Sequence, residues 1–392
     1  MRELLPELRA WHEAGTPFAL ATVVSVRGSA PRSPGAVMAV TAGGAVAGSV
    51  SGGCVEGAVY ELAGEVLASG IPQLQSYGIS DDEAFGVGLT CGGTIDVLVA
   101  PFASAADHAW LRGVTDSIAD GEPVAVATVL PGPAAAGARL VVRGDGAQGS
   151  LGNEGLDAAV TDDARGLLAQ GATGLQRYGE RGERRMQDVS VFVQTYAPPP
   201  RMLVFGAIDH AAATARIGSF LGYRVTVCDA RPAFATRERF PTADEVVCAW
   251  PHTYLSDTEI DGRTVVCVLT HDPKFDVPLL VAALRTPAAY IGVMGSRRTH
   301  LDRLARLREE GVAENDLARL ASPVGLDLGA RTPEETAVSI AAEIIQHRWG
   351  GTGRPLGELT GTIHHERREQ RRRADPEPRT GPPPHRPPPG TP

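Results

Sequence analysis

The stretch Arg201-Met202-Leu203-Val204-Phe205-Gly206 decides the fold of the C-terminal half of this chain. A short apolar run that ends in glycine and leads into a helical pattern is typical of the first strand, turn and helix of a nucleotide-binding α/β domain. Further apolar runs follow at 224–228, 245–248, 264–269 and 288–294, and helical patterns follow at 211–221, 299–310 and 333–347. Short strands alternating with helices predict a parallel sheet covered on both faces, and therefore a Rossmann-like domain over 201–350.

The dinucleotide fingerprint of this domain is incomplete. Asp229 stands 23 residues after Gly206, where an acid would meet a ribose hydroxyl, so both residues are candidate cofactor contacts. Ile208, however, replaces the second glycine of G-x-G-x-x-G/A, and its β-branched side chain obstructs the approach of a pyrophosphate. Asp209 adds a negative charge, and we expect it to cap the following helix instead. The turn argues against NAD(P) binding.

Two other polar segments follow predicted strands and should lie at the same edge of the sheet. Gly295-Ser296-Arg297-Arg298 combines helix-start N–H groups, a hydroxyl and two guanidinium groups, which suit a phosphate. Ser296 as an ordinary N-cap, with both arginines in solvent, is an equally good interpretation. Thr270-His271-Asp272-Pro273 places His271 and Asp272 at a strand end, where a role in the crevice is favoured over a structural one.

The chain outside this domain divides at Pro198-Pro199-Pro200, a stiff spacer within a linker at 197–200. Residues 1–196 predict a mixed α/β domain with its core at 17–101, and we interpret 103–196 as an extension of that domain. Strands are predicted at 18–26, 36–40, 94–99, 124–130 and 140–143, and helices at 55–69 and 163–168. Residues 364–392 are rich in Arg, Glu and Pro and predict a disordered tail.

Cys54 is the most informative residue of the N-terminal domain. It ends a glycine-rich run and directly precedes a helix, where N–H groups and the helix dipole favour a thiolate. A second cysteine with glycine neighbours stands at 91, and a loop at 28–35 adds a hydroxyl and a guanidinium group. The candidate contacts here are Ser29, Arg32, Ser51, Gly52, Gly53, Cys54, Glu56, Cys91, Gly92 and Gly93. The position of Glu56 at a helix start is also explained by the helix dipole alone. A zinc site is disfavoured because the two cysteines lack further ligands nearby.

Composition narrows the class of protein. A net charge of −9 gives no electrostatic case for nucleic acid or an anionic membrane. The chain has five cysteines, without the spacing of a disulfide framework, which indicates a reducing cytoplasm. We therefore expect Cys228, Cys248 and Cys267, which lie in apolar strand patterns, to be core residues. No apolar run of about 18 residues predicts a membrane span, and no signal peptide is evident.

As an ordered set, these blocks resemble the xanthine dehydrogenase accessory factor family (XdhC/CoxI). The resemblance covers residues 17–101 and 201–348 and is carried by Gly28-Ser29, Arg32, Gly35, 51–56, 91–93, 229–232, 270–273, 290–298, 323–327 and 331–335. It implies a homodimeric, non-catalytic factor that binds the molybdenum cofactor (molybdopterin) as cargo and protects it during sulfuration. It also implies transfer of the cargo to a molybdenum hydroxylase of the xanthine or CO dehydrogenase type, with a cysteine desulfurase as a second partner.

For a protein of this kind, soft thiolates suit a molybdenum–sulfur centre, so we expect Cys54 and Cys91 to contact the metal and Gly295-Ser296-Arg297-Arg298 to take the phosphate. One departure matters, because the family usually has Gly-Ala-Gly-His where this chain has Gly206-Ala207-Ile208-Asp209. Two alternatives stay open. The first is an NAD(P)-dependent oxidoreductase with a redox-active cysteine. The second is a thiol-redox regulator, which needs the Cα atoms of Cys54 and Cys91 about 4.4–6.8 Å apart.

Overall fold

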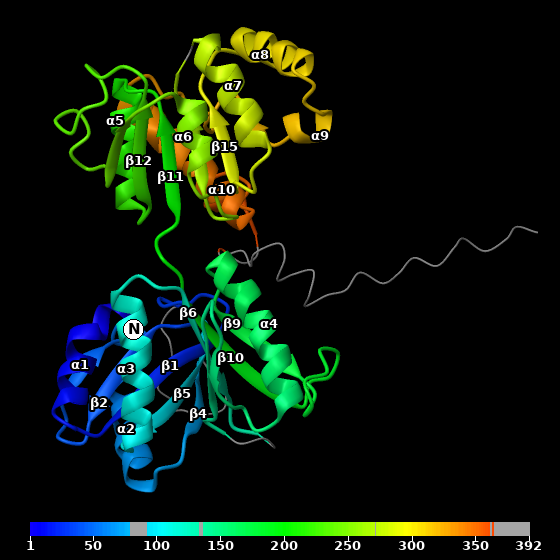
Figure 1. The fold of residues 1–392 in the computed structure, drawn as a ribbon. Helices are drawn as coiled ribbons and strands as arrows, with labels where there is room; N and C mark the ends of the chain where they lie inside the picture. The colour runs from blue at the N-terminus through cyan, green and yellow to red at the C-terminus, as the bar shows by residue number, and fades with distance from the viewer. Residues whose placement is uncertain (79–91, 133–135, 271, 361–362, 364–392) are drawn as a thin grey trace, which may run out of the picture.

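The computed structural model describes residues 1–78, 92–132, 136–270, 272–360 and 363. The predictions for Cys91, His271 and the tail therefore lie outside the described residues. The described strands form two five-stranded sheets and one six-stranded sheet. Figure 1 shows the six-stranded sheet in a C-terminal domain that is joined to the rest by one extended segment.

The first sheet follows a short N-terminal helical segment, η1 (Arg2–Leu4) and α1 (Leu5–Glu13). It consists of β1 (Phe18–Arg27), β2 (Val37–Thr41), β3 (Val46–Gly48), β4 (Gln73–Tyr77) and β5 (Thr94–Phe102), in the order β3-β2-β1-β5-β4. Helix α2 (Glu56–Ser69) packs on one face of this sheet through Val59, Ala63 and Val66. Helices α1 and α3 (Ala105–Ala119) contribute Leu8 and Leu111 to the cluster on its other face.

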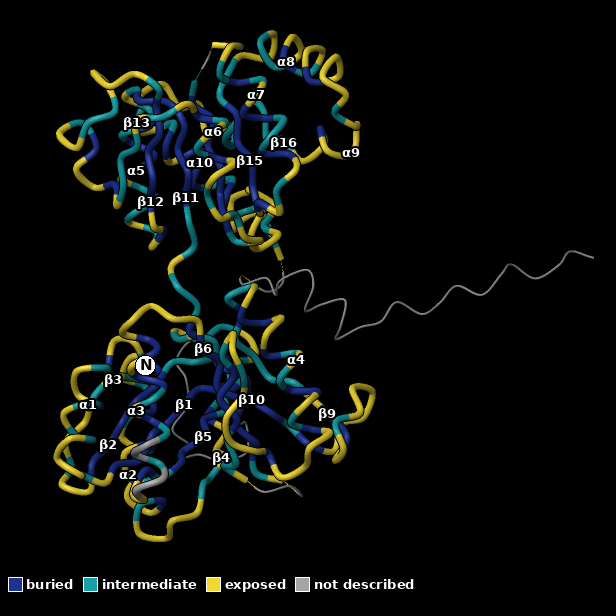
Figure 2. Tube along the Cα trace, in the orientation of Figure 1, coloured by how far each residue is buried: buried dark blue, intermediate teal, exposed yellow. Residues whose placement is uncertain are grey.

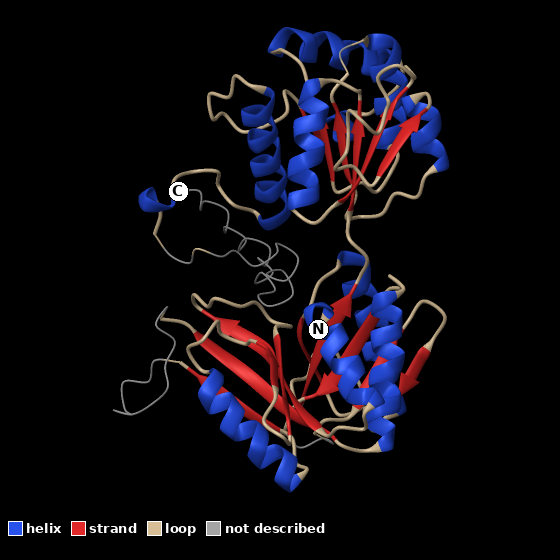
Figure 3. Cartoon of the chain, turned by 90° about the vertical axis from the view of Figure 1, so that its left-hand side faces the viewer, coloured by secondary structure: helices blue, strands red, loops and turns tan. Residues whose placement is uncertain are grey.

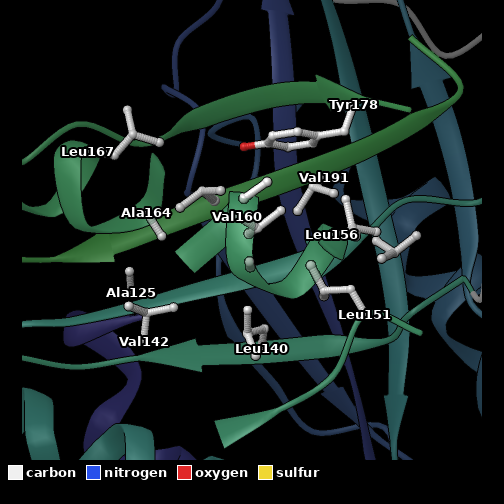
Figure 4. Packing of buried hydrophobic residues seen from close by; sticks show 14 of the residues in the cluster. Ala125, Leu140, Val142, Leu151, Leu156, Val160, Ala164, Leu167, Tyr178 and Val191 are labelled. Atoms are coloured by element: carbon white, nitrogen blue, oxygen red, sulfur yellow. The ribbon is translucent and has the colours of Figure 1, made fainter. Parts of the chain in front are cut away.

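Residues 124–196 form a second sheet rather than an extension of the first. Its elements are β6 (Val124–Val129), β7 (Arg139–Val142), β8 (Ala147–Gly149), α4 (Glu154–Gln170), β9 (Gly174–Tyr178) and β10 (Val189–Tyr196), in the order β8-β7-β6-β10-β9. Figure 4 shows Leu156, Val160 and Leu167 of α4 packed toward this sheet. The predicted helix at 163–168 was too short, and β10 was missed although it pairs with both β6 and β9.

The two sheets are copies of one structural unit. Each unit has three strands, a helix and two strands, joined in the same sheet order. Gly48 and Gly149 stand 101 residues apart, both with positive φ, and a Cβ on either would lie 2.4 Å from a carbonyl oxygen of the neighbouring strand. Gly70 and Gly171, again 101 apart, end α2 and α4 in the left-handed conformation. We call 18–102 the first copy and 124–196 the second copy.

The two copies pack directly on one another. Val24 and Leu98 of the first copy share a buried cluster with Leu130 and Phe192 of the second. In addition, the buried Gln194 donates from Nε2 to the carbonyl oxygen of Gly35 at 2.8 Å. Figure 2 shows the strands of both copies largely buried and the outer sides of the helices exposed. The copies therefore form one body.

The C-terminal domain confirms the predicted Rossmann-like fold with a parallel sheet. Its elements are β11 (Arg201–Phe205), α5 (Asp209–Phe220), β12 (Arg224–Asp229), β13 (Glu245–Cys248), α6 (Pro251–Asp257), β14 (Val265–Val268), α7 (Pro273–Leu284), β15 (Tyr290–Val293), α8 (Arg297–Glu309), α9 (Glu314–Leu317), β16 (Leu320–Ala321), α10 (Pro333–Trp349) and η2 (Leu356–Glu358). The strands are parallel in the order β13-β12-β11-β14-β15-β16. Figure 3 shows helices on both faces of this sheet.

The three cysteines of this domain do not behave alike. Cys228 and Cys267 are buried, as predicted for core residues. Cys248 is exposed, so the core prediction was wrong for this residue. The reason is that β13 lies at the edge of the sheet and Cys248 is its last residue, a position that periodicity does not reveal.

Candidate functional site

The turn before Cys54 is closed by the carboxylate of Glu56. Oε1 accepts from Ser49 Oγ at 2.6 Å and from the N–H of Ser51 at 2.9 Å. Oε2 accepts from Ser51 Oγ at 2.5 Å and from the N–H of Gly53 at 2.8 Å. This carboxylate fills the anion site that the N–H groups of a glycine-rich turn would otherwise offer. Ser51, Gly53 and Glu56 are therefore engaged with one another.

The protonation of Glu56 reflects this arrangement. Burial raises the pKa of the carboxyl, but hydrogen bonds from the Ser49 and Ser51 side chains and the Ser51 N–H outweigh burial and lower the pKa to about 2. Glu56 is therefore a charged structural acceptor at neutral pH. It does more than favour the helix dipole, because it ties residues 49–55 into one rigid turn.

Cys54 lies between this turn and helix α2. It is half-buried and packs against the core cluster of the first sheet, as Ala30 and Ala36 also do. A Cβ on Gly52 or Gly53 would meet no described atom within 4 Å, so the space over the turn is open in that direction. The turn thus places a half-buried thiol at a helix start, its two glycines face open space, and its polar groups are engaged by Glu56.

The second copy has lost this arrangement. Gly155 stands where the first copy has Cys54, and a Cβ on Gly155 would lie 2.4 Å from the carbonyl oxygen of Arg181. Asp157 takes the place of Glu56 and accepts from the N–H of Leu151 at 2.7 Å. The carboxylate contact to the turn is kept, but the position of the thiol is closed by backbone.

Gly28 and Ser29 of the loop at 28–35 contact Gly93 through their backbones. A Cβ on Gly93 would lie 2.1 Å from the carbonyl oxygen of Ser29, so only glycine fits there. Gly28 also approaches Gly93 closely, with a Cβ position 3.3 Å from the Cα of Gly93. Arg32 lies elsewhere, 3.9 Å from Glu3, and lines a cavity of about 460 Å³ between the two domains.

The carboxyl edge of the C-terminal sheet holds a smaller cavity of about 180 Å³, lined by Gly206, Ile208, Asp229, Arg231, Asp272 and neighbours. The Asp229 carboxylate already accepts from the N–H of Ala207 at 2.7 Å and from the Arg231 guanidinium at 2.8 Å. Burial raises the pKa of Asp229, but these bonds outweigh it and hold the pKa below its usual range. A ribose would have to displace Arg231.

Side chains cap the starts of α7 and α8 at this edge, but not the start of α5. Ile208 is the N-cap of α5 and gives no side-chain cap, so the prediction for Asp209 was wrong. Asp209 is the first helical residue, one place too late to cap, and is 86% exposed. Ser296 caps α8 by accepting from the N–H of Thr299 at 3.1 Å, and Asp272 caps α7 by accepting from Lys274. Arg297 and Arg298 are exposed.

Sequence reasoning missed a buried ion pair beneath this edge. Arg303 of α8 donates to Asp276 of α7 at 3.1 Å, and both side chains are less than 5% exposed. Arg303 also donates to the carbonyl oxygen of Met294 at 2.9 Å, just before the Gly295-Ser296-Arg297-Arg298 turn. Asp276 interrupts an apolar helical pattern, which was the one available signal.

The thiol turn and the carboxyl edge do not share a cavity. The linker leads into the amino end of β11, so the carboxyl edge of the sheet faces away from the N-terminal copies, as Figure 1 shows for α8 and α2. None of the residues lining the smaller cavity comes from the first copy. No cluster of three or more metal-binding side chains is found within the described parts of the chain, nor does any helix there have the length and apolarity to cross a membrane.

Comparisons with known proteins match both parts of the chain. The family model described as "XdhC and CoxI family" matches residues 11–78 and 117–179, once in each copy, and the model "XdhC Rossmann domain" matches 202–344. A Bacillus subtilis protein named as a probable xanthine dehydrogenase subunit is 35% identical over 162 residues, 41% of this chain and 47% of that protein. The molybdenum cofactor insertion chaperone PaoD of Escherichia coli is 30% identical over 153 residues, 39% of this chain and 42% of PaoD.

Two further relatives extend these matches. The uncharacterized protein YqeB of E. coli is 31% identical over 218 residues, 53% of this chain and 40% of that protein. The chain thus spans less than half the length of each curated relative that it matches. A crystal structure described as a xanthine dehydrogenase from Bacillus halodurans is 27% identical, with a TM-score of 0.62, and the match covers 88% of this chain and 95% of that one.

Proposed function

Because the chain belongs to the XdhC and CoxI family, we propose that it binds the molybdenum cofactor as cargo, protects it while sulfur is added, and passes it to a molybdenum hydroxylase. The relatives support this proposal. One carries the name of a molybdenum cofactor insertion chaperone and another that of a xanthine dehydrogenase subunit. The role is that of an accessory factor rather than a catalyst. A homodimer and a cysteine desulfurase partner are part of the same proposal.

The observation that carries the proposal is the thiol turn. Cys54 stands half-buried at a helix start, directly after two glycines that face open space, on a turn that Glu56 holds through its own hydrogen bonds. A soft thiolate in that place suits the metal end of a molybdenum–sulfur cargo. Because Ser51 and Glu56 are engaged with the turn, we propose that they position Cys54 rather than contact the cargo directly.

Other predicted contacts divide into two groups. Ser29, Gly92 and Gly93 lie together within the first copy. A metal contact by Cys91, which lies outside the described residues, stays a prediction from the sequence. The carboxyl edge on the other side of the linker holds Gly206, Asp229, Asp272 and the Gly295-Ser296-Arg297-Arg298 turn. A cargo held by Cys54 does not reach that edge within one chain. We therefore propose the edge as a separate surface.

Co-expression with the cofactor biosynthesis genes tests the proposal. We expect the purified full chain to carry molybdopterin, measured as its fluorescent oxidation product, and molybdenum, measured by mass spectrometry. Cys54→Ala should lower both at least tenfold. Cys248→Ala, which removes an exposed thiol from the other domain, should leave both unchanged. A wild-type chain without cargo, or normal loading of both Cys54→Ala and Cys91→Ala, would sink the thiol assignment.

The strand order of the C-terminal sheet favours one alternative, an NAD(P)-dependent oxidoreductase. Against it stand the side chain of Ile208 in the cavity and the pairing of Asp229 with Arg231. We expect no heat when NADH or NADPH is titrated into the protein. Binding of either nucleotide in the micromolar range would support the oxidoreductase alternative.

A further inference from the structure

The cavity between the domains is large enough for a small organic ligand. Its volume of about 460 Å³ lies within the usual range for ligand sites, about 300–1,000 Å³. Both copies, the linker and the amino edge of the C-terminal sheet contribute to its walls. The residues that give it chemical character are Arg2, Glu3, Arg32, Ser49, Thr173, Gln194, Thr195, Arg263 and Arg348.

The charge in this cavity is strongly positive. Four arginines line it and one acid, Glu3, stands 3.9 Å from Arg32. Arg263 is neutralised by Asp261 at 3.0 Å, and Arg2 donates to the carbonyl oxygen of Ala197. Arg348 stacks on the ring of Trp349 at 5.0 Å and also hydrogen-bonds with Tyr223. Arg32 and Arg348 come from different domains, and the long 3.9 Å contact of Arg32 with Glu3 is the one carboxylate contact that the described residues give this pair.

The linker beside the cavity is anchored by hydrogen bonds to its carbonyl oxygens. Arg263 donates from Nη1 to the carbonyl oxygen of Pro198 at 2.9 Å. The N–H of Arg224 donates to the carbonyl oxygen of Pro200, also at 2.9 Å. Since Arg2 binds Ala197 on the N-terminal side, the linker is fixed from both ends. The cavity is therefore a built feature of the domain junction.

The cavity also reaches the thiol turn. Ser49 lines it and donates to Glu56, the residue that closes the turn. Ala36 lines it as well and belongs to the same apolar cluster as Cys54. A ligand that fills the cavity would have one end near Arg32 and Arg348 and could extend along 34–36 toward the thiol.

We propose that this junction cavity binds an organic phosphate monoester, with Arg32 and Arg348 on the phosphate. Guanidinium groups form charge-assisted, bidentate bonds with phosphate, and two of them line this cavity from opposite domains. This inference rests on the proposed function for the identity of the ligand. In that setting the cavity holds the phosphorylated end of the cargo, and Cys54 contacts its metal end.

The test uses the full chain and inorganic phosphate in a calorimetric titration. We expect wild-type binding, and at least a tenfold loss of affinity in the double variant Arg32→Ala/Arg348→Ala. The matched control, Arg112→Ala/Arg306→Ala, removes two exposed arginines that do not line the cavity and should bind as wild type does. No wild-type binding up to about 10 mM phosphate, or equal affinity in both double variants, would overturn the proposal. Circular dichroism of each variant checks the fold.

A second measurement separates this inference from the proposed function. Molybdopterin content is compared between the Arg32→Ala/Arg348→Ala chain and the Cys54→Ala chain after the same co-expression. If the Arg32→Ala/Arg348→Ala chain carries as much molybdopterin as wild type while Cys54→Ala loses it, the proposed phosphate site is overturned and the proposed function stands. If phosphate binding depends on the two arginines but the wild-type chain never carries molybdopterin, the phosphate site stands and the proposed function is refuted.

Discussion

Replacing Glu56 by Gln should destabilise the N-terminal region in a pH-dependent way. The glutamine keeps the shape of the side chain, but its NH₂ group must face a donor, either Ser49 Oγ and the Ser51 N–H or Ser51 Oγ and the Gly53 N–H. The drop in pKa from 4.5 to about 2 corresponds to about 3 kcal/mol at full strength. Because Glu56 is only half-buried, solvent screening reduces our expectation to about 1.5–2 kcal/mol.

The sign of the pH dependence follows from the lowered pKa of Glu56. A carboxyl whose folded pKa lies below its unfolded value contributes stability above the unfolded pKa and loses it as pH falls through the folded one. The difference between wild type and Glu56→Gln should be complete at pH 7 and should shrink between pH 4.5 and about 2.

Urea unfolding at pH 7 and at about pH 3 measures this difference for Glu56→Gln. Asp157→Asn is the matched control, because Asp157 accepts one bond from the turn of the second copy, from the N–H of Leu151. Asp157→Asn should lower the free energy of unfolding by about 1 kcal/mol. A Glu56→Gln chain as stable as wild type at pH 7, or a difference that does not fall with pH, would refute the role of the carboxylate.

Three further substitutions test the packing. Arg303→Met leaves Asp276 charged and buried and should cost about 3–5 kcal/mol; a loss below about 1 kcal/mol in urea unfolding would contradict it. Gly93→Ala should disrupt the first copy, since its Cβ would lie 2.1 Å from a carbonyl oxygen, whereas Gly57→Ala, with open space around it, should be neutral by thermal denaturation. Gly155→Cys should lower the melting temperature without adding cargo, because backbone closes that position; doubled molybdopterin content would contradict this.

Much of the C-terminal domain could be predicted from the sequence. Its strands are short apolar runs, such as Arg201–Phe205 and Tyr290–Val293, that end at glycine or polar residues, and parallel sheets buried on both faces require such runs. Helix α2 was also predicted closely, because Gly70 marks its end and Val59, Ala63 and Val66 are buried at helical spacing. In these elements the spacing of apolar residues in the sequence matches the secondary structure that forms.

The rest depends on contacts that local patterns do not contain. The acceptance of six turn donors by Glu56 depends on the three-dimensional path of the turn. The exposure of Cys248 depends on strand order, and the separation of the thiol turn from the carboxyl edge depends on the direction in which β11 leaves the linker. The duplication did leave a signal, since Gly48-Ser49-Val50 and Gly149-Ser150-Leu151 match, but it is visible only when distant segments are compared.

The two copies of the duplicated unit differ in what they are attached to and in which residues they carry. The strand that continues into the linker is β10, which belongs to the second copy. The copy that carries Cys54 is joined to it by a shared buried cluster and by the Gln194–Gly35 hydrogen bond. The second copy therefore carries the covalent attachment of the C-terminal domain, and the first copy carries the thiol.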